Sequence, residues 1–173
     1  MQSRVQLFSS VQISRMVRRI AFEVIESNKS ADNLIIVGIL NRGARLARLI
    51  ADSIGGISNL DVPVRNIDVS AYRDDSHRTA KVPANGSAGA LDVTDKDVLL
   101  VDDVLYTGRT VRAALDAVVD LGRPKTIQLA VLVDRGHREF PIEPTFVGRR
   151  VQTKYREHVE VVLDGDPSVF VEE

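Results

Sequence analysis

The chain has 173 residues, which suits one domain with a sizeable core and leaves no room for a second. Apolar residues make up 44% and charged residues 27%, so an intrinsically disordered protein is excluded, and the lack of cysteine excludes a disulfide scaffold and a thiolate zinc site. The net charge of −1 does not indicate a nucleic-acid-binding protein, although it leaves room for a local basic face. No stretch is apolar and long enough for a membrane span or a signal core, so we expect a cytoplasmic protein without membrane contact.

The first predicted element is an amphipathic helix over residues 10–27. Its apolar positions recur three and four residues apart: Ile13, Met16, Val17, Ile20, Ala21, Val24 and Ile25. Arg15, Arg18 and Arg19 lie on another face of this helix. That face is typical of a solvated charged surface, which is the favoured interpretation, and it also suits contact with a polyanion.

A buried strand is predicted at residues 34–39, followed by the tight loop Leu40-Asn41-Arg42-Gly43 and a helix that Gly55-Gly56 is expected to end. A glycine in such a loop lets the backbone approach a ligand closely. Arg42 either pairs with a phosphate oxygen or is a surface residue at the start of a helix.

Residues 62–71 are predicted to form a more polar strand, which leads into Tyr72 and Arg73. Over residues 74–92 the chain then loses all periodicity. A structureless segment of this length in a compact domain is typical of a lid, and a plain surface excursion is the alternative. We expect a lid whose base is formed by Tyr72 and Arg73.

The strongest pattern in the chain lies at residues 97–110. The apolar run 97–101 predicts a strand buried on both faces. Asp102 and Asp103 follow, where this strand is expected to end, and Thr107-Gly108-Arg109-Thr110 then opens a helix.

Each part of this pattern has a chemical use. Threonine and glycine at a helix N-terminus offer backbone N–H groups, hydroxyls and the positive end of the helix dipole, which suits a phosphate monoester. Two adjacent carboxylates accept hydrogen bonds from vicinal hydroxyls or hold Mg²⁺. The two features together indicate a site for ribose 5-phosphate.

A fourth strand is predicted at residues 126–133, and it is the third to end in a polar loop that contains glycine, here Asp134-Arg135-Gly136-His137. Because strands alternate with helices, right-handed crossovers bring the three loops to one edge of a parallel sheet, where ligands bind. Phe146 follows and suits either stacking on a planar base or packing in the core. Two further short strands are predicted at residues 157–163 and 168–171.

Residues 98–110 resemble the phosphoribosyl-pyrophosphate (PRPP) signature of type I phosphoribosyltransferases. Within that group the chain resembles the pyrimidine operon attenuation regulators, which also act as uracil phosphoribosyltransferases. The segments that carry this resemblance are 72–75, 101–110, 121–124 and 128–139. The likeness extends from about Ile13 to Gly148.

The resemblance implies a type I phosphoribosyltransferase fold. This is a single α/β domain over residues 1–173, with a parallel sheet flanked by helices, a flexible lid loop at about 74–92 and a small hood. It implies the formation of UMP and diphosphate from uracil and PRPP, with Mg²⁺ as cofactor. It also implies binding to pyrimidine-operon mRNA that depends on UMP or UTP and causes transcription attenuation. We expect a homodimer or a higher homo-oligomer.

The resemblance also assigns residues to roles. Asp102 and Asp103 are the expected catalytic and metal-binding residues. The residues expected to bind PRPP or nucleotide are Asn41, Arg42, Gly43, Tyr72, Arg73, Val104, Leu105, Tyr106, Thr107, Gly108, Arg109 and Thr110. The residues expected around the base are Asp134, Arg135, Phe146 and Val147. Our hypothesis is that Asp134 accepts a hydrogen bond from uracil, and recognition of the base by backbone groups is the alternative. No residue stands out as the general base, and His137 is a candidate.

Departures from the regulators bear on RNA binding. Phe22 and Ser27 stand where many of them have basic or polar residues, and residues 149–156 differ as well. The basic residues left for RNA are Arg18, Arg19, Arg149, Arg150, Lys154 and Arg156. The alternatives are therefore a salvage transferase without RNA binding, a nucleotide sensor with poor turnover and, less favoured, a purine transferase.

Overall fold

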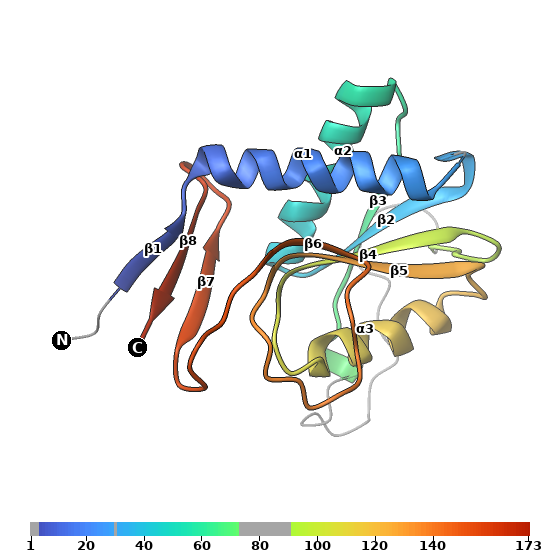
Figure 1. The fold of residues 1–173 in the computed structure, drawn as a ribbon. Coiled ribbons are helices and arrows are strands. Elements are labelled where there is room, and N and C mark those ends of the chain that lie inside the picture. Colours follow the sequence, from blue (N-terminus) through green and yellow to red (C-terminus); the bar gives the residue numbers. More distant parts are fainter. Residues whose placement is uncertain (1–3, 30, 73–90) are drawn as a thin grey trace.

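A computed structural model describes residues 4–29, 31–72 and 91–173, and they form two sheets and three helices (Figure 1). The main sheet has five parallel strands in the order β3-β2-β4-β5-β6. These are β2 (Leu34–Ile39), β3 (Val64–Ile67), β4 (Asp97–Leu105), β5 (Thr126–Asp134) and β6 (Phe146–Arg150). The predicted parallel α/β sheet is confirmed.

The helices cover both faces of this sheet (Figure 1). They are α1 (Ser10–Ser27), α2 (Arg42–Ser58) and α3 (Arg109–Asp120), and two short 3₁₀ turns lie at η1 (Ala31–Asn33) and η2 (Ser70–Tyr72). Side chains of α1 and α2 share one core with Ile36 and Leu99. Side chains of α3 share the other core with Val37 and Leu100. Adjacent residues of a central strand thus pack into opposite cores, which is why β2 is apolar along its length and β4 is apolar from Val98 to Val101.

The hood is a second, antiparallel sheet in the order β1-β8-β7. Its strands are β1 (Arg4–Phe8), β7 (His158–Val162) and β8 (Ser168–Glu172). Val159, Val161 and Val169 are buried and join the core beneath α1. Strands β7 and β8 were predicted from the sequence, whereas β1 was not.

Three element boundaries differ from the predictions. Strand β4 continues through the acidic pair to Leu105, so that Asp102 and Asp103 lie within the strand. Helix α2 runs through Gly55-Gly56 and ends only at Ser58, where Asn59 adopts a left-handed φ of 55°. Strand β3 is much shorter than the predicted 62–71 and is followed by η2.

Most of the segment predicted as a lid, residues 74–92, lies outside the described residues, and so does Arg73. None of the helices in the described part of the chain is long and apolar enough to cross a membrane.

Candidate active site at the carboxyl edge of the parallel sheet

Strands β2, β4 and β5 are neighbours, so the loops that follow them meet at one edge of the sheet. Backbone hydrogen bonds join two of these loops, because the N–H groups of Glu139 and Phe140 donate to the carbonyl of Thr107 at 2.9 and 3.0 Å. The N–H of Arg135 also donates to the carbonyl of Leu105 at 3.0 Å. The structure therefore brings together the three loops that the sequence predicted to share an edge.

The acidic pair lies in the middle of this edge. Asp102 is 8% exposed, and its Oδ1 accepts the backbone N–H of Asp103 at 2.9 Å. Burial, followed by the charge of Asp103, raises the pKa of Asp102 well above its ordinary value of 3.8. A buried carboxyl beside a second one is a group that a bound cation would stabilise in its charged form.

Gly43 brings the loop after β2 against this acidic pair. A Cβ added to Gly43 would lie 2.5 Å from the carbonyl oxygen of Val101 and 3.1 Å from Cα of Asp102. Only glycine allows this approach. The peptide bond between Leu40 and Asn41, at the start of the same loop, is cis.

The loop after β4 has the geometry of an anion site. Gly108 has a φ of 90° and is the N-cap of α3, so the first N–H groups of a twelve-residue helix open onto this loop. A Cβ on Gly108 would also lie 3.3 Å from Cβ of Phe140. Arg109 donates to Glu139 at 2.6 Å, so the loop after β5 supports the first turn of α3.

Arg42 projects from the first turn of α2 toward the hood. Its Nη2 lies 3.4 Å from Oε1 of Glu160 in β7. Next along α2, Arg45 pairs with Asp164 at 3.4 Å. The loop predicted to bind pyrophosphate is thus linked to the hood by ion pairs.

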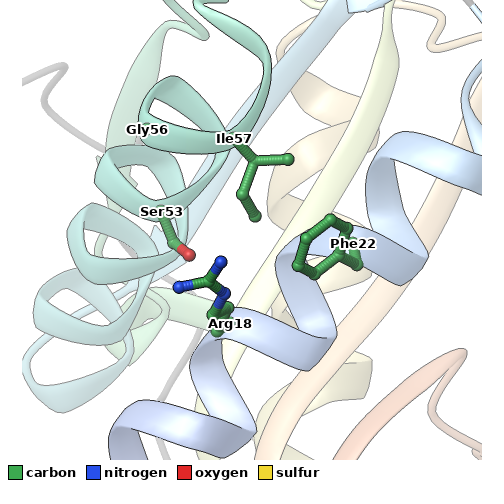
Figure 2. A pocket seen from close by; sticks show the side chains of 5 residues that line it. All are labelled: Arg18, Phe22, Ser53, Gly56 and Ile57. Atoms are coloured by element: carbon green, nitrogen blue, oxygen red, sulfur yellow. The ribbon is translucent and has the colours of Figure 1, made fainter.

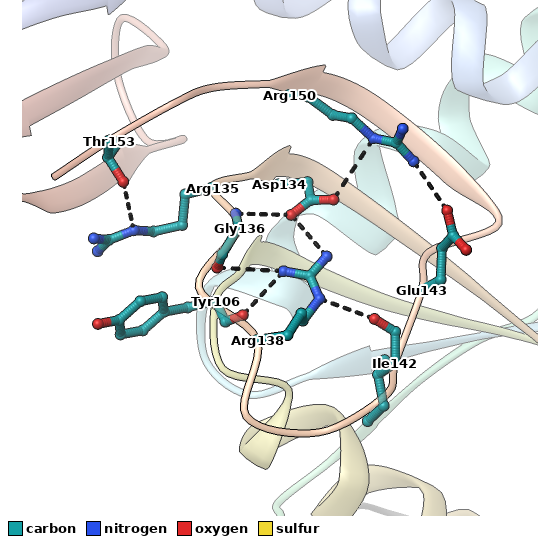
Figure 3. Close-up of polar contacts among 9 residues, drawn as sticks. All are labelled: Tyr106, Asp134, Arg135, Gly136, Arg138, Ile142, Glu143, Arg150 and Thr153. Carbon is teal, nitrogen blue, oxygen red and sulfur yellow. Dashed lines mark hydrogen bonds and ion pairs between the residues drawn. The ribbon is translucent and has the colours of Figure 1, made fainter. Parts of the chain in front are cut away.

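The loop after β5 is organised by Arg138, whose guanidinium lies among acceptors from three segments (Figure 3). It donates to the carboxylate of Asp134 at 2.7 Å and to the carbonyls of Tyr106 and Ile142, each at 2.9 Å. The carboxylate of Asp134 also accepts the N–H of Gly136 at 3.1 Å and lies 3.7 Å from Nε of Arg150. The oxygens of Asp134 thus hold the loop, and its expected hydrogen bond to uracil stays a prediction.

Arg135 is buried rather than open to a ligand. It donates to Thr153 at 3.1 Å and to the carbonyl of Lys154 at 3.1 Å, and it lies 4.1 Å from the ring centroid of Tyr106. His137 contacts the same segment, with Nε2 2.7 Å from the carbonyl of Thr153. Since a carbonyl can only accept, Nε2 carries the proton and is not the general base in this arrangement.

Three further predicted site residues lie elsewhere. Phe146 is 4% exposed in the core beneath α1, so its ring is not available to stack on a base, and the alternative of a core residue holds. Val147, beside it in β6, packs against the core on the α3 side. The hydroxyl of Tyr72 donates to Asp120 at 2.7 Å, and Asp120 ends α3, about 16 Å from the first residue of that helix at 1.5 Å per residue.

Three of the six basic residues proposed for RNA binding have acidic or backbone partners. Arg19 pairs with Glu23 at 3.0 Å and also donates to the carbonyls of Val147 and Gly148, which ties α1 to β6. Arg150 pairs with Asp134 and Glu143, and Lys154 with Glu157 and Glu173. Arg18, Arg149 and Arg156 make no ion pair with the described residues.

A pocket of about 460 Å³ lies between α1 and α2 (Figure 2). It is lined by Arg18, Phe22, Ser53, Gly56 and Ile57. The ring of Phe22 is 48% exposed, and the guanidinium of Arg18 lies 5.7 Å from its centroid. The pocket is separate from the carboxyl edge, because Ser53, Gly56 and Ile57 belong to the last turns of α2, whereas its first turn holds Arg42 and Gly43.

Sequence reasoning missed Arg138, Glu139 and Glu160, each of which contacts a predicted site residue. Arg138 and Glu139 lie inside residues 128–139, a segment that carried the family resemblance, and this resemblance could have identified them as site residues. No signal in the sequence pointed to Glu160, because its position is typical of an exposed charge in a half-buried strand. Its partner, Arg42, lies 118 residues away in the sequence.

Residues 3–164 match the phosphoribosyl transferase domain. The chain therefore belongs to the phosphoribosyltransferase family. Its relatives include the bifunctional protein PyrR of Acetivibrio thermocellus, which is 50% identical over 94% of this chain and 89% of its own. The bifunctional protein PyrR of Clostridioides difficile is 48% identical over 100% of both chains. The predicted relation to the bifunctional regulators is confirmed.

Solved structures agree on the fold. The hypoxanthine-guanine phosphoribosyltransferase of Bacillus anthracis superposes with a TM-score of 0.70 at 20% identity, covering 87% of this chain and 85% of its own. The hypoxanthine phosphoribosyltransferase of Trypanosoma cruzi gives a TM-score of 0.71 at 18% identity, covering 95% and 94%. The predicted type I phosphoribosyltransferase fold is confirmed.

Proposed function

We propose that the chain transfers the ribose 5-phosphate group of PRPP to uracil, forming UMP and diphosphate, and that it also binds pyrimidine-operon mRNA when a uridine nucleotide is bound. The observation that carries the transfer is the contact of Gly43 with Asp102 beside the N-terminus of α3. This close approach supports the proposal, because it brings the loop after β2 against the acidic pair on the strand that leads into α3.

In this proposal each group has a defined task. Residues 107–110 hold the 5-phosphate, and Asn41, Arg42 and Gly43 meet the leaving pyrophosphate. Asp102 and Asp103 accept hydrogen bonds from the ribose hydroxyls and stabilise positive charge on the sugar as the bond to pyrophosphate breaks. No protein nucleophile is needed.

Mg²⁺ fits this donor set. Magnesium is usually bound by one or two carboxylates together with substrate phosphates, and Asp102 and Asp103 supply two adjacent carboxylates beside the pyrophosphate loop. Bound there with PRPP, the ion would neutralise charge on the leaving group.

The base pocket is proposed around the loop after β5. Because Asp134 holds Arg138, we propose that Asp134 and Arg135 shape this pocket and that backbone groups read the base. Phe146 lies outside it, because its side chain is in the core, whereas Val147 is partly buried and stays a candidate for this pocket.

The first experiment measures nucleotide formation from PRPP and Mg²⁺ with uracil, hypoxanthine, guanine and orotate in parallel. We expect turnover with uracil alone. Turnover with a purine instead of uracil would show that the purine is the substrate. Tight UMP binding without turnover would identify a nucleotide sensor instead.

For RNA, the specific observation is the exposed Phe22 ring beside Arg18 (Figure 2). Single-stranded RNA is bound by aromatic rings on which bases stack, with arginine nearby for phosphate. Phe22 replaces a polar or basic residue of the regulators, but it supplies such a ring, and Arg149 adds an exposed charge without an ion pair among the described residues.

The RNA proposal is tested by binding of a pyrimidine-operon leader transcript with and without UMP, at several salt concentrations. We expect affinity that requires UMP and falls steeply with salt. We expect Phe22→Ala to weaken it by about 1–3 kcal/mol, the usual contribution of one stacked base. Binding that is flat with salt or indifferent to UMP would leave a salvage transferase without RNA binding.

We further propose a homodimer or higher homo-oligomer in the cytoplasm. Light scattering at several protein concentrations measures the oligomeric state directly.

A further inference from the structure

A single carboxylate of the hood contacts two arginines that lie far apart in the sequence. Oε1 of Glu160 lies 3.4 Å from Nη2 of Arg42, in the loop proposed to bind pyrophosphate. Oε2 of Glu160 accepts a hydrogen bond from Nη2 of Arg4 at 3.0 Å. Glu160 therefore joins the hood to the pyrophosphate loop.

The two contacts of Glu160 differ in strength. Arg4 is held from several sides, since its Nε also lies 3.1 Å from Glu172 and its guanidinium lies 4.0 Å from the ring centroid of Phe170. Arg42 has one long contact with Glu160, and its side chain is 47% exposed. When Arg42 moves away, Glu160 remains paired with Arg4, so no charge is left without a partner.

Diphosphate is a stronger partner for Arg42 than Glu160 is. A guanidinium binds phosphate oxygens through paired, charge-assisted hydrogen bonds, whereas an exposed pair at 3.4 Å contributes little. It is therefore favourable for Arg42 to leave Glu160 and bind diphosphate. The affinity for diphosphate is reduced, however, because the contact between Arg42 and Glu160 is lost and because the negative charge of Glu160 remains nearby.

From this geometry we propose that Glu160 competes with diphosphate for Arg42. Glu160 holds Arg42 toward the hood when the loop is empty, and it takes Arg42 back as diphosphate leaves. Glu160 is thus a positioning residue that favours release of the diphosphate product. This inference rests on the proposed function, because it assumes that the loop containing Arg42 binds diphosphate.

The test is a calorimetric titration of Mg²⁺-pyrophosphate into the full chain, paired with product inhibition by pyrophosphate in the uracil assay. We expect Glu160→Gln to lower both the Kd and the inhibition constant about two- to fivefold, the usual range for an exposed ion pair. Glu172→Gln is the matched control. Like Glu160, Glu172 is a carboxylate that pairs with Arg4, and it lies on the neighbouring strand. Because Glu172 does not contact Arg42, the Kd of Glu172→Gln for pyrophosphate should equal that of the wild type.

A second background separates contact from general charge. In the Arg42→Ala variant, Glu160→Gln should leave the Kd for pyrophosphate unchanged, because the competing contact no longer exists. Tightening that persists in this background, or weaker pyrophosphate binding in Glu160→Gln alone, would overturn the inference. A wild-type chain that binds no pyrophosphate and forms no UMP would instead refute the proposed function.

Discussion

The burial of the Asp102 carboxyl group lowers the free energy of unfolding of the protein when this group is ionised. The carboxyl group lies beside Asp103, and its pKa is raised. The folded chain therefore keeps a proton on Asp102 at pH values where the unfolded chain has lost it. The free energy of unfolding should fall as the pH rises from about 4 through the raised pKa.

We predict that Asp102→Asn abolishes this fall, because asparagine does not titrate. At neutral pH the ligand-free variant should be about 1 kcal/mol more stable than the wild type, which corresponds to about 2–4 °C in Tm for a chain of this size. UMP formation should fall at least about 100-fold, the scale of losing one preorganised electrostatic group. Calorimetry across pH and the transfer assay measure the two effects. A variant as active as the wild type would contradict the role of Asp102.

Tyr72 is a residue whose hydrogen bond stabilises the fold rather than the site. Burial, with the bond to Asp120, raises the pKa of Tyr72 to about 12. The stabilisation is complete below the ordinary tyrosine pKa of 10.0 and is lost as the pH rises through the raised value.

We predict that Tyr72→Phe lowers the free energy of unfolding by about 1 kcal/mol at neutral pH. The absorbance titration of tyrosine should lose its highest step, while the KM for PRPP stays unchanged. Urea unfolding and ultraviolet titration measure these effects. An increased KM for PRPP would show instead that Tyr72 contacts the substrate.

At the scale of elements, α2 contains two glycines in opposite surroundings. Gly43 in its first turn lies against β4, where a Cβ would meet the carbonyl of Val101 at 2.5 Å. Gly56, near its end, has nothing within 4 Å of the place of its Cβ.

We predict that Gly43→Ala costs about 2 kcal/mol or more, because α2 and β4 must separate and the acidic pair moves with β4. UMP formation should fall with it. Gly56→Ala in the same helix should instead add about 0.5–1 kcal/mol, since alanine favours the helix. Urea unfolding of both variants compares the two positions, and equal effects would contradict the close approach of α2 to β4 at Gly43.

The loops after β4 and β5 form one unit through Arg138. Lysine cannot reproduce its separate bonds to Asp134, Tyr106 and Ile142. We predict that Arg138→Lys raises the KM for both PRPP and uracil about tenfold, as expected for the loss of one charged hydrogen bond. Arg123→Lys, an exposed arginine after α3, is the control and should leave both KM values unchanged. A KM change for uracil alone would mean that Arg138 does not support the phosphate loop.

The elements that the sequence predicted well are those with one dominant signal. Helix α1 was predicted over about residues 10–27 and lies there, because its apolar stripe is regular. The end of β4 was missed because acidic residues rarely continue a buried strand. The end of α2 was missed because Gly55-Gly56 reads as a stop signal, although tertiary packing continues the helix there.

Within the site, the sequence predicted which loops meet. It did not predict which side chains already contact other parts of the protein. The loops follow from strand order and crossover handedness. The occupation of Asp134 by Arg138, of Arg42 by Glu160 and of Phe146 by the core depends on distances across the fold. No local pattern encodes such distances.

At the scale of the whole molecule, the hood depends on β8. This strand lies between β1 and β7, and Val169 within it is fully buried. We predict that deleting residues 168–173 destabilises the protein by about 3 kcal/mol or more, as expected for loss of a buried side chain and two strand pairings. Deletion of Glu173 alone, beyond β8, should change the free energy of unfolding by less than about 0.5 kcal/mol. Thermal unfolding compares the two, and a small effect of the larger deletion would contradict a single cooperative unit.

The pairing of β1 with β8 has a consequence for synthesis. Arg4 lies opposite Glu172 in the sheet, so β1 has no strand to pair with until nearly all of the described chain has been synthesised. Contacts between such distant residues are slow to form, because the intervening chain must be ordered first. The pairings of β8 with β1 and β7 can form only after β8 has been made. A nascent chain therefore carries an unpaired β1 edge, which makes this edge the expected point of contact for a chaperone.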